Sequence, residues 1–343
     1  MKLRILIFLI IALYCAFPQN LRGESVSSSL LGETRNANTA SFLKIGAGAK
    51  ATALGGAFVA VADDASAGYW NPAGLAQLKG PIISLADRTP VMDTNYASIA
   101  IASPAWWFGF VGLNAIYYGS GDVATYNDYG VSTGTLTDRE AAIILSYAYN
   151  LNQLLLGANA KYIYQEMNAD DTGSANYDGL GADVAVLYKV YEHLTVGANF
   201  HSKYKMTGDN GSDVANESPI NIRAGVHYKA NIGSNNLINF MIDLNQTKAY
   251  PLKLHLGTEL VLYDTLAFRV GLNDLYAETN GADIDRLDLI KHNAKPTVGL
   301  GFKWEIGKNT MDSDSKQSAI LFDYALSIEK LGIRNFFTLA YQF

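Results

Sequence analysis

The strongest chemical signal in this chain is a glycine-rich stretch, KIGAGAKATALGG, which runs from Lys44 to Gly56. Gly46, Gly48 and Ala51 have the G-x-G-x-x-A spacing with which a dinucleotide-binding fold holds a pyrophosphate at a helix N-terminus. That fold also needs a buried strand before the first glycine and a ribose-binding acid about twenty residues later. Only SFLKI precedes Gly46, and no α/β alternation follows. The sequence therefore does not predict a nucleotide site.

A packing role fits these glycines better. Glycine lets one backbone pass close to another and adopts conformations that other residues avoid. We interpret the stretch as chain that fits and moves within a confined space. The positions expected to allow this packing and movement are Gly46, Gly48, Gly55 and Gly56.

No arrangement of residues in the chain is typical of an enzyme. The histidines show no metal-ligand spacing, and no motif of a serine hydrolase is present. The single cysteine, Cys15, lies in an apolar run close to the N-terminus, within a segment expected to be removed. The sequence therefore predicts no enzyme activity, no metal and no cofactor.

The first residues have the features of a signal peptide. Lys2 and Arg4 precede the apolar run ILIFLIIALYCAF, which is too short to span a bilayer. Cleavage is expected after Gly23. The expected organisation is a signal peptide at 1–23, an N-terminal segment at 24–80 and a body at 81–343.

Composition and charge favour an exported protein rich in sheet. Charged residues make up 17% of the chain and aromatic residues 11%, with 21 tyrosines. Removing Lys2, Arg4 and Arg22 from the 26 basic residues leaves 23 against 32 acidic ones, which argues against nucleic acid as a partner. Beyond residue 17 no apolar stretch reaches the length of a membrane helix, so a membrane role would have to use strands.

Alternation with a period of two residues is the main structural signal in 81–343. In 295–305, one face carries Val298, Leu300, Phe302 and Trp304, opposite Thr297, Gly299, Gly301, Lys303 and Glu305. In 194–206, the apolar face is assigned Leu194, Val196, Ala198, Phe200 and Tyr204. One apolar face with aromatic residues near its ends and one glycine-rich, polar face are typical of a transmembrane β-barrel, with lipid outside and a polar lumen inside.

About fourteen such segments occur, an even number as bacterial barrels require. They are 81–86, 95–103, 108–119, 139–149, 153–166, 178–190, 193–206, 219–229, 236–246, 253–262, 265–273, 295–305, 318–327 and 335–343. Their connections mostly alternate between short turns and longer loops rich in Gly, Asp, Asn and Ser. The sequence thus predicts an all-β fold, a transmembrane antiparallel β-barrel of about 14 strands.

The C-terminus supports this fold. The chain ends on FFTLAYQF, in which alternate residues form one apolar face: Phe337, Leu339, Tyr341 and Phe343. This pattern resembles the last-strand signal that the outer-membrane assembly machinery recognises. We therefore expect outer-membrane lipid and that machinery to be partners.

Several polar side chains are expected to point into the barrel lumen. They are His201, Lys203, Arg223, His227, Lys253, His255, Glu259, Arg269 and Lys303. Four of them are candidates to attract a ligand carboxylate: His201, Lys203, Arg223 and His227. Phe58, Tyr69 and Trp70 are expected to supply apolar surface beside them. The alternative is a polar lumen whose charges pair with one another and with Lys50, Asp63 and Asp64 of the N-terminal segment.

The N-terminal segment contains two further signals. Asn71 followed by Pro72 predicts an N-cap and the first position of a short helical turn. Asp63 and Asp64 are interpreted as capping residues of the turn that follows them, although a pair of carboxylates also suits acid–base or metal chemistry.

The block GAGAKATALGGAFVAVADDASAGYWNPAGLA resembles the N-terminal signature of the PorV/PorQ and UPF0164 group within the FadL-like outer-membrane barrels. The resemblance implies a fourteen-stranded barrel whose N-terminal segment is a plug, or hatch, in the lumen. Asn71, Pro72 and Ala73 match the family's Asn-Pro-Ala element. The chain departs from the FadL transporters in being shorter, with modest outer loops.

The resemblance implies two functions. FadL members take up long-chain fatty acids and other hydrophobic compounds, whereas PorV and PorQ relatives act in type IX protein secretion. We expect an outer-membrane transporter through which hydrophobic small molecules diffuse inward past a hatch formed by the glycine-rich stretch with Asp63, Asp64, Asn71 and Pro72. The alternative is a component of type IX secretion that binds secretion-system proteins.

Overall fold

The structure is a computed structural model. It describes residues 41–89, 94–105, 107–170, 173–202, 204–208, 213–218, 220–248, 251–275, 294–306, 318–329 and 332–343. The expected signal peptide, 1–23, lies outside the described residues, so its cleavage stays a prediction.

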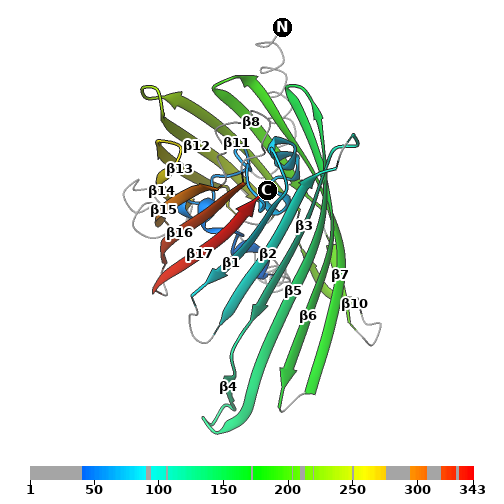
Figure 1. The fold of residues 1–343 in the computed structure, drawn as a ribbon. Helices are drawn as coiled ribbons and strands as arrows, with labels where there is room; N and C mark the ends of the chain where they lie inside the picture. The colour runs from blue at the N-terminus through cyan, green and yellow to red at the C-terminus, as the bar shows by residue number, and fades with distance from the viewer. Residues whose placement is uncertain are drawn as a thin grey trace, which may run out of the picture.

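Within these described ranges, seventeen strand elements form one closed antiparallel sheet (Figure 1). They are β1 (Ile82–Arg88), β2 (Asn95–Pro104), β3 (Phe110–Gly119), β4 (Val123–Tyr126), β5 (Ser132–Leu151), β6 (Leu154–Ala169), β7 (Gly173–Tyr191), β8 (Leu194–His201), β9 (Tyr204–Gly208), β10 (Asp213–Ser218), β11 (Asn221–Asn231), β12 (Asn236–Thr247), β13 (Lys253–Leu262), β14 (Leu266–Leu275), β15 (Lys295–Ile306), β16 (Ser318–Glu329) and β17 (Gly332–Gln342).

The sheet closes because β1 pairs with both β2 and β17. Three elements are continuations of others: β4 follows β3 along β5, β9 follows β8 along β7, and β10 precedes β11 and pairs with β9. The seventeen elements therefore make the 14 strands of a barrel, which confirms the predicted fold class.

The predicted two-faced strands explain why the sheet closes in this form. On β15, Val298, Leu300 and Trp304 point outward, and Trp304 is 61% exposed, whereas Thr297 is buried on the inner face. Exposed apolar side chains in alternate positions are stabilised in a bilayer, and closure leaves no unpaired strand edge there.

The alternation predicted for 194–206 is wrong at its end. Phe200 is 39% exposed on the outer face, but Tyr204 is only 9% exposed and packs inside with Met206 and Ile144. The ladder stops at His201 and resumes at Tyr204, and this interruption changes which residues face inward. Lys203 itself lies outside the described residues.

Some predicted loops are strand instead. The segments 120–138 and 167–177 lie between the predicted strands, yet β5 begins at Ser132 and β7 at Gly173. Figure 1 shows β4 to β7 extending well past the neighbouring strands. Their polar residues pair across the extended hairpins, so polarity in these segments reflects exposure rather than irregular backbone.

Residues 41–80, here named the luminal segment, lie inside the wall. They form η3 (Ser41–Lys44), α3 (Ala49–Ala53), α4 (Ala67–Trp70) and η4 (Pro72–Gln77). α3 contacts β14 to β17, whereas η4 contacts β5 to β7 on another side of the barrel (Figure 1). None of the helices in the described ranges is long and apolar enough to cross a membrane.

We expect the unboiled protein to run faster than the boiled protein in detergent electrophoresis, because a closed strand ladder resists detergent. Circular dichroism should be dominated by sheet. A chain truncated before Gly332 lacks β17, and so loses its pairing with both β1 and β16; it should lose the fast band. A spectrum dominated by helix would contradict the fold.

Candidate functional site: the luminal segment and the outer cavity

The luminal segment approaches the barrel wall backbone to backbone at Gly55. A Cβ atom added to Gly55 would lie 2.6 Å from the backbone nitrogen of Leu272 on β14. The contact is reciprocal, since a Cβ on Gly271 would lie 2.2 Å from the Gly55 nitrogen. Gly55 also has φ +65°, a conformation that other residues rarely adopt. Only glycine fits both sides of this contact.

Further wall glycines face the same segment. A Cβ atom added to Gly157 would lie 2.1 Å from the Ala73 nitrogen, and one added to Gly197 would lie 2.6 Å from the Val59 oxygen. A Cβ atom added to Gly257 would lie 2.7 Å from the Leu54 oxygen, and one added to Gly299 would lie 2.4 Å from the Ala53 Cβ. These contacts come from β6, β8, β13 and β15. The glycines of the polar strand faces therefore make room for the luminal segment, a role that alternation alone did not reveal.

One buried carboxylate holds the backbone of the segment. Asp243 on β12 is 1% exposed, and its Oδ2 accepts hydrogen bonds of 2.8 Å from the backbone N–H groups of Phe58 and Val59. These two donors belong to irregular chain, so the carboxylate replaces partners that a helix or strand would supply. The sequence analysis missed Asp243, which is an ordinary inward position of its strand.

The cap predicted at Asn71 and Pro72 is present. Asn71 Oδ1 accepts from the Ala73 N–H at 3.0 Å, and Pro72 begins η4. The Asn71 amide also donates to the Val59 carbonyl at 2.8 Å. Asn71 therefore joins two parts of the luminal segment as well as capping the turn.

Two wall asparagines hold the carbonyls of α4. Asn159 on β6 donates to the Gly68 oxygen at 2.8 Å, and Asn199 on β8 donates to the Trp70 oxygen at 2.8 Å. The Trp70 indole donates in turn to the Ala47 carbonyl at 2.8 Å. Apart from their inward position, nothing in the amino-acid pattern distinguishes these asparagines.

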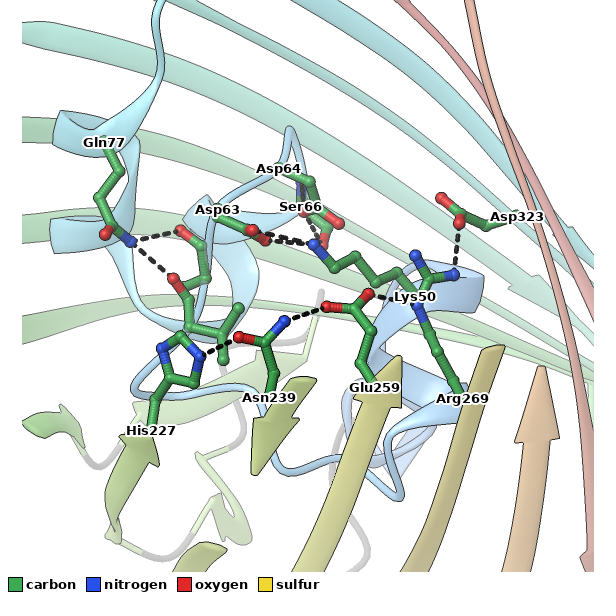
Figure 2. Close-up of polar contacts among 12 residues, drawn as sticks. Lys50, Asp63, Asp64, Ser66, Gln77, His227, Asn239, Glu259, Arg269 and Asp323 are labelled. Carbon is green, nitrogen blue, oxygen red and sulfur yellow. Dashed lines mark hydrogen bonds and ion pairs between the residues drawn. The ribbon is translucent and has the colours of Figure 1, made fainter. Parts of the chain in front are cut away.

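On the side of the short turns, a polar network lies against the luminal segment (Figure 2). Lys50 pairs with Asp63 at 2.7 Å across the segment. On the wall, Glu259 pairs with Arg269 at 2.8 Å. The chain of contacts continues from Arg269 to Asp323 at 2.5 Å, from Glu259 to Asn239 at 2.8 Å, and from Asn239 to His227 at 2.9 Å. His227, predicted to bind ligand, belongs to this network.

Asp64 has a local role. Its Oδ1 accepts from the N–H and the hydroxyl of Ser66 at 2.8 and 2.6 Å, just before α4 begins. Ser66 is the N-cap residue of α4 and makes no side-chain cap hydrogen bond, so Asp64 stabilises the turn before the helix and does not cap the helix as predicted. Burial raises the pKa of Asp64 to about 6, and the neighbouring Asp63 carboxylate acts in the same direction. Asp63, in contrast, is an ion-pair partner rather than a cap.

A cavity of 390 Å³ lies on the other side of the luminal segment, towards the strand ends that lead into the long connections. Such connections face the outside in outer-membrane barrels, so we name it the outer cavity. Its lining consists of Leu43, Lys44, Ile45, Gly56, Tyr69, Trp70, Arg88, Lys161, His201, Tyr204, Asn221, Arg223, Asn245, Thr247, Lys253, His255, Asn273, Asp274, Lys295, Glu329 and Arg334.

The outer cavity brings together four of the predicted ligand-binding residues: Tyr69, Trp70, His201 and Arg223. The Arg223 guanidinium lies 5.0 Å from the Trp70 ring centroid. The centroids of the Tyr69 and Trp70 rings are 5.1 Å apart. Phe58 is fully buried behind Trp70 and does not line the cavity. Lys203 lies outside the described residues.

Most cationic groups of the cavity have carboxylate partners. Lys161 and His201 both contact Asp183, at 2.6 and 3.0 Å. Lys253 and Lys295 share Asp274, at 2.9 and 2.6 Å. Arg334 pairs with Glu329 at 3.0 Å. The expected alternative, in which luminal charges pair with one another, therefore describes a large part of this wall.

The C-terminal residues lie where the alternation predicts. Phe337, Leu339 and Phe343 are exposed on the outer face of β17 and at the chain end. The Tyr341 ring lies 4.6 Å from that of Phe343. Recognition of this face by the assembly machinery stays a prediction. Within the described ranges, no group of three His, Cys, Asp or Glu side chains is placed to hold a metal ion.

A sequence profile described as "Uncharacterised protein family (UPF0164)" matches residues 27–239. A search among curated proteins found no match.

Solved structures share the architecture at low sequence identity. The Ralstonia pickettii toluene transporter TbuX has 15% identity and a TM-score of 0.56, covering 87% of this chain and 98% of its own. The monoaromatic hydrocarbon channel CymD has 13% identity and a TM-score of 0.56, covering 87% and 96%. A Pseudomonas aeruginosa FadL homologue has 11% identity and a TM-score of 0.50, covering 84% and 95%.

The glycine contacts predict unequal effects of two neighbouring substitutions. Gly55→Ala and Gly56→Ala both place alanine at positive φ, which costs about 1 kcal/mol. Only at Gly55 does the new methyl meet wall backbone; at Gly56 the nearest atom, His255 Nδ1, is 3.5 Å away. Gly55→Ala should therefore lose about 3 kcal/mol more stability, measured by urea titration of the fast electrophoretic band. Equal losses would contradict the close approach.

Replacing Asp243 should loosen the segment without opening the barrel. Asp243→Ala leaves the Phe58 and Val59 N–H groups without their acceptor, at about 1–3 kcal/mol for each donor. Hydrogen exchange at these two amides should accelerate at least about tenfold. Asp178→Ala, at an exposed wall aspartate on β7, is the control and should leave both amides protected.

Proposed function

Because the chain belongs to the UPF0164 family and has the fold of the FadL-like outer-membrane barrels, we propose that it lets hydrophobic small molecules cross the outer membrane past the luminal segment. The toluene transporter TbuX and the hydrocarbon channel CymD have the same architecture. Toluene and monoaromatic hydrocarbons are the substrates of those two proteins; for this chain the proposal depends on its own cavity.

The observation that carries the proposal is the two-sided lining of the outer cavity. On one side, Leu43, Ile45, Tyr69, Trp70 and Tyr204 offer apolar and aromatic surface. Facing them are basic and amide side chains of the wall. A molecule with an apolar body and an acidic group, such as a long-chain fatty acid, satisfies both surfaces. The Arg223 guanidinium is a suitable partner for its carboxylate.

The luminal segment forms the floor of this cavity and separates it from the polar network around Glu259. Passage requires that part of the segment move. The Gly55 contact and the Asp243 hydrogen bonds resist movement of 54–60, because they join backbone directly to the wall. Gly46 and Gly48, with φ +92° and +83°, lie in the part that covers the cavity and are better placed to act as hinges.

These contacts support a hatch mechanism. A ligand enters from the side of the long connections and binds between the aromatic rings of the segment and the basic wall. The segment around Gly46 and Gly48 shifts, and the ligand leaves towards the short turns. No bond is made or broken, so the direction of net movement is set by the concentration gradient.

A strain that lacks the gene should take up labelled oleate more slowly than the parent, and the intact gene should restore uptake. Trp70→Ala should restore it poorly, because it removes the ring beneath Arg223. Trp304→Ala is the matched control, since Trp304 is 61% exposed on the outer face. Both variants are first checked for the fast electrophoretic band.

The same strains distinguish the two functions. Normal uptake together with secreted proteins retained in the periplasm would contradict the transport proposal and favour the role in type IX secretion. Equal uptake by the Trp70→Ala and Trp304→Ala strains would show that transport does not depend on the Trp70 surface of the outer cavity.

A further inference from the structure

One buried histidine of the outer cavity has a ring nitrogen that the fold does not use. His255 on β13 lines the cavity and is 2% exposed. Among the described residues, including the facing Asp243 on β12, no group forms a hydrogen bond with its Nε2 atom. A buried polar atom without a partner costs free energy and marks a place where a ligand group can bind.

The other ring nitrogen of His255 determines where the imidazole carries its hydrogen. Nδ1 lies 3.1 Å from the Gly55 carbonyl oxygen and 2.8 Å from Asn273 Oδ1. A carbonyl oxygen can only accept, so Nδ1 carries the hydrogen and donates it. The neutral ring then has a lone pair at Nε2, which makes this atom a hydrogen-bond acceptor. A ligand group that pairs with Nε2 must therefore be a donor.

Arg223 makes the opposite demand on a ligand. Its guanidinium has N–H groups and no acceptor, so it binds acceptors such as a carboxylate. It lines the same cavity, where it lies 5.0 Å from the Trp70 ring centroid. Only β12 separates β11 from β13, so Arg223 and His255 point into the lumen from strands about 10 Å apart. A head group in the cavity can therefore meet donors from Arg223 and an acceptor from His255.

From this arrangement we infer that the preferred ligands of the outer cavity are hydroxylated fatty acids, with the hydroxyl on one of the first carbons after the carboxylate. The carboxylate accepts from Arg223, the hydroxyl donates to His255 Nε2, and the apolar body lies along Tyr69 and Trp70. A hydroxyl suits Nε2 better than an ammonium donor, because the Arg223 cation repels a second positive charge. The inference rests on the proposed function and narrows its substrate class.

Three ligands of similar size test this inference on the purified full-length barrel. 3-Hydroxydecanoate offers a donor, 3-methoxydecanoate keeps the oxygen without the donor, and decanoate has neither. Calorimetry should show 3-hydroxydecanoate binding about tenfold more tightly than the other two, a difference of about 1.4 kcal/mol, because both analogues leave Nε2 unpaired. The same comparison is made with substituents on carbon 2, and the preference at either position supports the inference.

His255→Phe should bind the three ligands with affinities within about twofold of one another, since the phenyl ring has no acceptor while Arg223 still binds the carboxylate. His193→Phe is the matched control, because His193 is exposed and does not line the outer cavity; it should keep the full preference. Both variants are first checked for the fast electrophoretic band. His255→Phe also loses the Gly55 contact, so if its band is absent the comparison of ligands on the unmodified protein decides.

Nitrogen NMR of labelled histidine gives an independent readout. The His255 Nε2 signal should be that of an unprotonated nitrogen, and it should shift with 3-hydroxydecanoate but not with the methoxy analogue. A protonated Nε2 in the ligand-free barrel, or equal affinity for hydroxy, methoxy and unsubstituted acids at both carbon positions, would overturn the inference. Equal affinities would leave the proposed fatty-acid transport standing, whereas failure of every acid to bind would contradict both.

Discussion

The close approach of backbone to backbone between the luminal segment and the barrel wall is the constraint that positions everything else in the lumen. At Gly55 and Gly271 the backbones of the segment and the wall are so near that neither position has room for a Cβ atom. Similar contacts at Gly157 and Gly197 place the segment against other strands, so it is fixed across the lumen at one level. That level divides the interior into an outer cavity and a polar network on the side of the short turns.

A segment with little regular structure can occupy a barrel only if its backbone polar groups find partners, because each unpaired buried group costs free energy. The wall provides them from inward positions. Asp243 accepts from two N–H groups, Asn159 and Asn199 donate to carbonyls of α4, and the Thr297 hydroxyl donates to the Ala53 carbonyl at 2.9 Å. The polar lumen expected of a membrane barrel is therefore, in this protein, also the complementary surface for its own N-terminal residues.

The division of the lumen gives its charges different surroundings. Below the segment, carboxylates and cations pair in a closed network that includes Glu259 and Arg269. Above it, several basic side chains line the outer cavity and Arg223 stacks on Trp70. The proposed transport function uses this difference: the basic and aromatic side chains of the cavity attract an acidic amphiphile, whereas the charged groups below are joined to one another.

The barrel can be predicted from the amino-acid sequence alone. Alternation along each strand decides which side faces lipid, so the pattern is sufficient to assign the faces of β15 and of the terminal aromatic residues. The Asn71 cap can also be predicted from the sequence, since it is a local interaction.

Alternation assigns a residue to one face of the strand but does not say how far along the barrel axis it lies. For that reason His201 and His227 look alike in the sequence, although His201 lines the cavity and His227 lies in the network below. The interruption after His201, which turns Tyr204 inward, is likewise invisible to a pattern that assumes a continuous strand. The roles of Asp243, Asn159 and Gly271 emerge only in the folded barrel, because each acts on residues far away in sequence, and contacts of that kind depend on where the closed wall places its strands.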